Sequence, residues 1–115
     1  MSNNEFPGFD ACIDLIRSKD PMIFEDGYHL LLPRVKDFGD RIVKLIQSES
    51  DPKIKPRFVE LLGECEDKQY LPIFEKLLES EIHDVVAWSL TSLERINSGL
   101  SIAEKFRKNN PKWSE

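Results

Sequence analysis

The stretch DPKIKPRFVELL at residues 51–62 has a counterpart on either side of it in the chain. Residues 20–31 read DPMIFEDGYHLL and residues 82–93 read IHDVVAWSLTSL, so the pattern returns at a spacing of 31. All three segments end in leucine, and aliphatic residues recur at matching positions. A fixed period of this length is typical of helical repeat proteins, in which each unit buries its apolar face against its neighbours. The sequence therefore predicts an all-α fold, a short α-α solenoid of about three helical hairpins.

Apolar residues at a period of 3.6 predict the individual helices. The Asp-Pro pairs at 20–21 and 51–52 mark two helix starts, because the carboxylate can cap the first turn and proline lacks only an N–H that would stay unbonded there. Pro56 lies inside the fourth helix and is expected to bend its first turn. We expect seven helices, at about 9–18, 21–32, 34–48, 52–65, 69–80, 84–97 and 100–108.

The length of 115 residues suits one domain, which we place at 1–108, followed by a polar C-terminal tail at 109–115. The N-terminus lacks the pattern of a secretory signal, and no apolar run approaches the roughly 20 residues that cross a bilayer. We therefore expect a cytoplasmic protein. Cys12 and Cys65 both fall at apolar helical positions, so we expect two buried free thiols.

Acidic residues outnumber basic ones, 21 to 16, which gives a net charge of -5. The segment 51–81 carries the largest share, and 82–115 is mildly basic. Nucleic acid is a poor partner for such a chain, since phosphate binding needs a basic surface. An acidic chain suits a basic protein partner better.

Residues 51–65 resemble the first helix of a HEAT repeat. That pattern has Asp-Pro, an aliphatic and a basic residue, two small or apolar residues and then Leu-Gly; Ile54, Lys55, Phe58, Val59, Leu62 and Gly63 take these places. The segments at 82–96 and 20–31 match less closely, with Val86, Glu94 and Gly27 as departures. The resemblance covers about 80 residues. It implies a fold, and leaves reaction and ligand open.

Small acidic helical-repeat chains also resemble bacterial immunity proteins, including those of contact-dependent growth inhibition systems. This similarity rests on size, charge and architecture. It implies a non-enzymatic protein that binds and neutralises a basic toxin, which could be a nuclease. A general HEAT-like scaffold or adaptor is a second hypothesis. A HEAT-like enzyme, such as a DNA glycosylase or a chromophore lyase, is a third, although the basic groove of such glycosylases is not seen in the sequence.

Side chains that could carry chemistry have simpler explanations here. Glu60 with Glu64, and Glu75 with Glu79, are carboxylate pairs at helical spacing, which we interpret as solvated helix faces. The two histidines lack metal-binding spacing, and no glycine-rich phosphate loop is present. We therefore expect no catalytic residues, no metal and no cofactor.

The partner-binding residues are expected on the third and fifth helices, which should line the concave side as in HEAT proteins. Trp88 is added because it takes a position that is polar in the two preceding units, and exposed tryptophans anchor protein partners. Its alternative role is as an apolar residue covered by the last helix. The predicted set is Asp37, Asp40, Arg41, Lys44, Glu75, Lys76, Glu79 and Trp88.

Overall fold

The computed structural model describes residues 5–114, and within that range it contains helices and no strand. The all-α prediction with seven α-helices is confirmed. The α-helices are α1 (Phe9–Ile16), α2 (Pro21–Leu31), α3 (Gly39–Ser48), α4 (Lys55–Glu64), α5 (Leu71–Leu77), α6 (His83–Arg95) and α7 (Leu100–Asn109). Short 3₁₀ segments join them: η1 (Leu32–Phe38), η2 (Lys68–Tyr70), η3 (Asn97–Gly99) and η4 (Pro111–Trp113).

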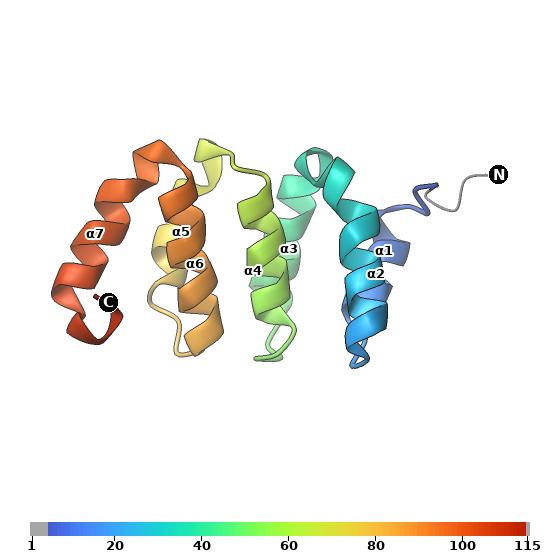
Figure 1. Cartoon of the computed structure of the whole chain (residues 1–115), viewed down its shortest axis with the longest axis horizontal. Helices are drawn as coiled ribbons and strands as arrows, with labels where there is room; N and C mark the ends of the chain where they lie inside the picture. Colours follow the sequence, from blue (N-terminus) through green and yellow to red (C-terminus); the bar gives the residue numbers. More distant parts are fainter. Residues whose placement is uncertain (1–4, 115) are drawn as a thin grey trace.

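The helices stand side by side in a row, in two layers (Figure 1). α1 packs on α2, α3 on α4 and α5 on α6, and α4 also packs directly on α6. α2, α4 and α6 form the front layer in Figure 1, with α1, α3 and α5 behind them. The result is an elongated molecule of 51 × 26 × 24 Å. No helix among the described residues has both the length and the apolar character that a membrane crossing requires.

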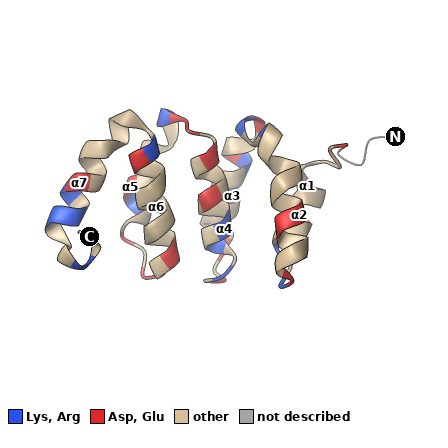
Figure 2. Cartoon of the chain, in the orientation of Figure 1, with Lys and Arg blue, Asp and Glu red and all other residues tan. Residues whose placement is uncertain are grey.

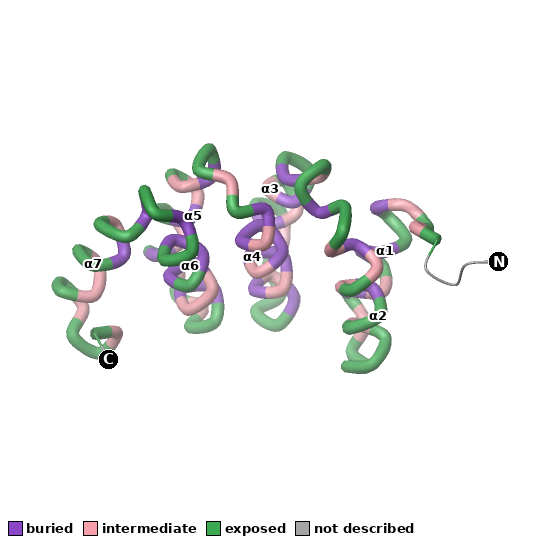
Figure 3. The backbone as a smooth tube through the Cα atoms, turned by 45° about the horizontal axis from the view of Figure 1, so that its top comes forward, coloured by how far each residue is buried: buried purple, intermediate pink, exposed green. Residues whose placement is uncertain are grey.

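The row is arched (Figure 3). α1, α3 and α5 lie on the upper, outer side of the arch in this view, and α2, α4 and α6 on the lower, inner side. The expectation that α3 and α5 line the concave side is therefore wrong. On the inner side α4 packs directly on α6, whereas hollows lie between α3 and α5 on the outer side.

The apolar positions that repeat at a spacing of 31 form the core. Val59, Leu62, Leu90 and Leu93 are each at most 1% exposed. Cys12 and Cys65 are also buried and free, as expected, and burial raises the pKa of the Cys65 thiol to about 11. The pattern therefore predicted correctly that these side chains are buried.

Polar side chains connect the hairpins at nearly the same spacing. Five side-chain hydrogen bonds join residues that are 30 to 32 positions apart in the chain. The pairs are Arg17 with Glu49, Arg41 with Asp10, Cys65 with Val35, Tyr70 with Asp40, and Arg95 with Glu64. Contacts at one repeat length are what stacking of equivalent units produces.

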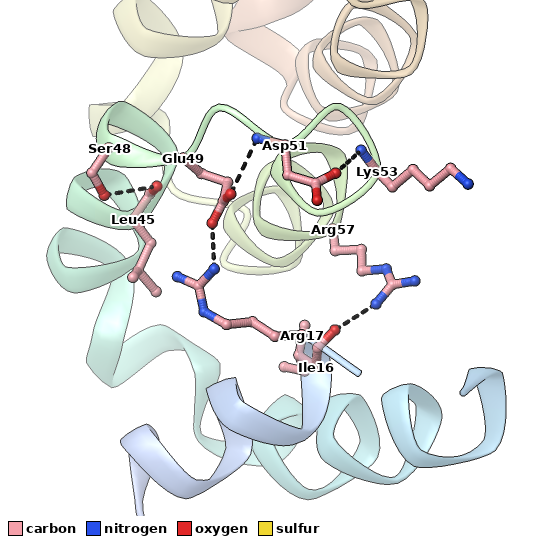
Figure 4. A network of polar contacts seen from close by, with 8 residues as sticks. All are labelled: Ile16, Arg17, Leu45, Ser48, Glu49, Asp51, Lys53 and Arg57. Atoms are coloured by element: carbon pink, nitrogen blue, oxygen red, sulfur yellow. Dashed lines mark hydrogen bonds and ion pairs between the residues drawn. The ribbon is translucent and has the colours of Figure 1, made fainter. Parts of the chain in front are cut away.

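The first hairpin is attached to the second by two arginines (Figure 4). Arg57 donates to the main-chain oxygen of Ile16 at 2.6 Å and to that of Ser18 at 2.8 Å, so it caps the C-terminal end of α1. Its guanidinium also lies 4.1 Å from the ring centroid of Phe24. From the other side, Arg17 pairs with Glu49. These contacts hold α4 against both helices of the preceding hairpin.

Three helix boundaries differ from the sequence expectation by three residues or more. The third α-helix begins at Gly39 instead of residue 34, because residues 32–38 form the 3₁₀ segment η1, with Pro33 in its first turn and Val35 buried. The fourth begins at Lys55 after a turn in which the Asp51 carboxylate accepts from the Lys53 N–H at 2.8 Å. Pro56 is therefore the second residue of the helix, where its missing N–H would have no partner within the helix. The fifth α-helix ends at Leu77 and not at residue 80.

The C-terminal residues fold back on the last two helices. Trp113 stacks on His83 at the start of α6, with ring centroids 4.7 Å apart. Arg107 in α7 donates to the main-chain oxygen of Trp113 and pairs with Glu94 in α6 at 3.1 Å. The described part of the tail thus ties α7 to α6.

Gly27 sets the distance between α1 and α2. A Cβ atom at this position would lie 2.6 Å from the Leu15 Cβ and 2.8 Å from the Cys12 carbonyl oxygen. We expect Gly27→Ala to lower the free energy of unfolding by about 1–3 kcal/mol, because main-chain atoms must shift to admit the methyl group. Urea unfolding would measure this, with the exposed neighbour Asp26→Ala as control. A Gly27→Ala variant as stable as the parent would show that the two helices are not held in contact.

Candidate functional site

The predicted partner-binding residues fall on two different sides of the molecule. Six of them lie on η1, α3 and α5, on the outer side of the arch, and a seventh, Glu79, lies in the turn that follows α5. We call this set the outer face: Asp37, Asp40, Arg41, Lys44, Glu75, Lys76 and Glu79. Trp88 lies on α6, in the inner layer, where it is half-buried against the core. The structure therefore brings the first seven residues to one side and separates Trp88 from them.

The outer face is hollowed between its helices. One hollow between α3 and α5 is lined by Asp40 and Lys44, and a second by Lys76 and Glu79. A third lies between α5 and α7, where Glu75 and Glu79 line it. Five of the seven residues thus border concave surface that a partner could occupy.

Two residues of the outer face are engaged within the protein. The Asp40 carboxylate accepts a hydrogen bond from the Tyr70 hydroxyl at 2.8 Å, and burial together with this carboxylate raises the tyrosine pKa. Arg41 pairs with Asp10 at 2.8 Å and lies over the Phe9 ring. Asp40 and Arg41 therefore position neighbouring helices, which leaves less of their charge available to a partner.

The inner side carries a second set of mostly polar residues, which occupy equivalent positions in the three repeats. Arg57, Glu60 and Glu64 are the part of α4 that points away from the buried Phe58, Val59, Leu61 and Leu62. One repeat earlier and later, the equivalent positions on α2 and α6 hold other polar or amphipathic side chains. We call this set the inner face: Asp26, His29, Arg57, Glu60, Glu64, Trp88, Thr91 and Arg95.

Glu64 joins the three hairpins on this face. It accepts a hydrogen bond from the Tyr28 hydroxyl on α2 at 3.0 Å. From α6, Arg95 approaches to 3.2 Å, and the hydrogen bond to Glu64 raises the arginine pKa. The register of 31 places Arg95 at the position equivalent to Glu64, so this pair could have been found from the sequence; Tyr28, 36 positions from Glu64, could not.

Glu60 was expected on a solvated helix face, and the structure makes it half-buried instead. Burial is the main cause that raises its carboxyl pKa, and the charge of Glu64 adds to it. The Tyr28 hydroxyl and the Arg95 charge act in the opposite direction without cancelling the shift. Carboxylates with raised pKa values often mark functional surfaces, because their charge is poorly compensated in the free protein.

Comparisons with known proteins give no relative for this chain: no family model, curated protein or solved structure matches it. The two faces are therefore judged by geometry and charge. The outer face offers hollows with charges of both signs, and the inner face offers three carboxylates, two arginines, Trp88 and the half-buried Glu60.

The raised pKa of Glu60 has a consequence for stability. The folded protein binds the Glu60 proton more tightly than the unfolded chain does. Protonated Glu60 therefore adds to the free energy of unfolding below the ordinary glutamate pKa, and this contribution is lost as the pH rises through the pKa of Glu60 in the folded protein. We expect Glu60→Gln, which cannot ionise, to be more stable than the parent at about pH 7, with the difference vanishing below about pH 4.

Thermal unfolding at a series of pH values would measure the difference, with exposed Glu75→Gln as the matched control on α5. A Glu60→Gln variant that is less stable than the parent at neutral pH would contradict a raised pKa of Glu60 in the folded protein.

Proposed function

We propose that this chain is a non-enzymatic protein-binding module that binds a basic partner through its inner face. The most specific form of this proposal is a cytoplasmic immunity protein that neutralises a basic bacterial toxin. The observation that carries it is the half-buried Glu60 carboxylate, which forms no ion pair among the described residues and belongs to a face with three carboxylates and two arginines.

Acidic residues colour parts of the ribbon of α2, α4 and α6 red (Figure 2). The inner face itself contributes Asp26, Glu60 and Glu64. Arg95 pairs with Glu64, so these two charges offset each other, while Arg57 donates to main-chain oxygens at the end of α1 and keeps its charge. A lysine or arginine of a partner would supply the positive charge that Glu60 lacks.

The same charge would act before contact. With a net charge of -5 overall, the chain attracts cationic proteins over distances of about 10 Å at moderate ionic strength. Steering of this kind raises the association rate, and the bound module would then cover the active site of the toxin. Trp88, half-buried among these charges, would supply apolar contact area to the partner.

The arrangement of helices supports a binding role of the HEAT type. Repeat stacks present long surfaces that are fixed by their own core, so a partner meets side chains already in place. In this chain the inner face extends over three hairpins and is held by the Tyr28–Glu64–Arg95 connection.

Growth rescue tests the specific proposal. The domain encoded by the neighbouring gene would be expressed alone and together with the chain; the expected result is that it stops growth alone and that co-expression permits growth. If co-expression fails to restore growth, the immunity assignment is wrong. Binding of an unrelated partner without salt dependence would instead indicate a scaffold.

Charge reversal separates the two faces. We expect the inner-side pair Glu25→Lys/Asp26→Lys to lower the association rate with the basic partner by about tenfold or more at low ionic strength, because both exposed carboxylates contribute to steering. The outer-face pair Glu75→Lys/Glu79→Lys makes the same change in net charge and serves as control. Stopped-flow or surface-based kinetics would compare the association rates of the two double variants. If both lose the same fraction of the association rate, the inner face is not the binding surface.

A further inference from the structure

The outer side carries a groove that the proposed function does not use. Two of the hollows between α3 and α5 adjoin, since Gln47 and Ile73 line both. Their volumes are about 640 and 470 Å³, and each is open to solvent. We call this continuous feature the α3–α5 groove.

Its floor is apolar. Val43 and Ile46 come from α3, and Pro72, Ile73 and Leu77 come from α5. Ile46 is buried, whereas Val43, Ile73 and Leu77 remain partly exposed. A row of partly exposed aliphatic side chains between two helices is the surface that an amphipathic segment covers when it binds in a groove.

The border of the groove is basic. Lys44, Lys55 and Lys76 all line it, and within residues 5–114 none of the three forms an ion pair. Lys55 is half-buried at the start of α4. The groove also has two carboxylates, and one of them, Asp40, is bonded to Tyr70. Three lysines against two carboxylates, Asp40 and Glu79, leave the groove with a small net positive charge, on a chain whose net charge is negative.

We infer that the α3–α5 groove docks an acidic amphipathic peptide segment of a partner protein. Aliphatic side chains of the segment would cover Val43, Ile73 and Leu77, and its carboxylates would accept hydrogen bonds from the lysines at the border. The apolar floor favours a peptide over a nucleic acid, because phosphates would engage the lysines and leave the floor uncovered.

This surface differs from the inner face in both position and charge. The inner face attracts cations and the groove attracts carboxylates, so one peptide chemistry cannot satisfy both. Variants at the two places therefore test the two proposals separately.

Selection from a displayed library of random 16-residue peptides on the intact chain tests the inference. The enriched peptides are expected to combine Asp or Glu with aliphatic residues at helical spacing. For the best synthetic peptide, Lys44→Glu/Lys76→Glu should weaken binding at least tenfold in fluorescence polarisation, and higher salt should weaken binding to the parent.

The control is Lys53→Glu/Lys108→Glu, which makes the same change in net charge at exposed positions away from the groove. Circular dichroism would verify that both double variants are folded. Ile73→Ser, which removes an aliphatic side chain from the floor, should also weaken binding while leaving the lysines intact.

Three results would overturn the inference. The first is that the selection enriches basic peptides, or enriches no peptide at all. The second is that the groove variant and the control variant lose the same amount of peptide affinity. The third is that the chain binds a single-stranded oligonucleotide more tightly than the selected peptide. Loss of peptide binding in Glu25→Lys/Asp26→Lys but not in Lys44→Glu/Lys76→Glu would assign the peptide to the inner face instead.

Discussion

The fold depends on one constraint: a two-helix hairpin has apolar side chains on more than one side and cannot cover them by itself. α4 illustrates this, because Phe58, Leu61 and Leu62 are fully buried only with α3, η1 and α6 packed around them. Burial of a large aliphatic or aromatic side chain contributes about 1.5–3 kcal/mol, so each interface between hairpins contributes substantially to stability. The row of helices is the arrangement that satisfies this requirement for the middle hairpin from both sides.

Polar contacts then fix how the hairpins are aligned. Arg57 caps the end of α1, Arg41 reaches Asp10, and Glu64 receives both Tyr28 and Arg95. Most exposed ion pairs add little stability, at most about 1 kcal/mol each. Their importance here is directional, since apolar packing alone would tolerate a shift of one hairpin along the next.

The arch gives the two sides different properties. On the inner side, close packing of the helices partly buries Glu60 and raises its pKa. On the outer side the helices spread, and the gaps expose Val43, Ile73 and Leu77 beside lysines. An acidic face and a lysine-bordered groove therefore arise from one geometric feature, and an overall charge of -5 conceals the difference between them.

The sequence by itself determined the helices, their number and the buried positions, because the period of 3.6 and the repeat of 31 are both visible in the chain. It even contained the Glu64–Arg95 pairing, since those residues are one repeat apart. It did not determine which layer forms the inner side of the arch, and it assigned Glu60 to a solvated surface. Only tertiary structure decided these points, because the curvature of the row and the burial of Glu60 depend on how closely helices distant in sequence approach one another.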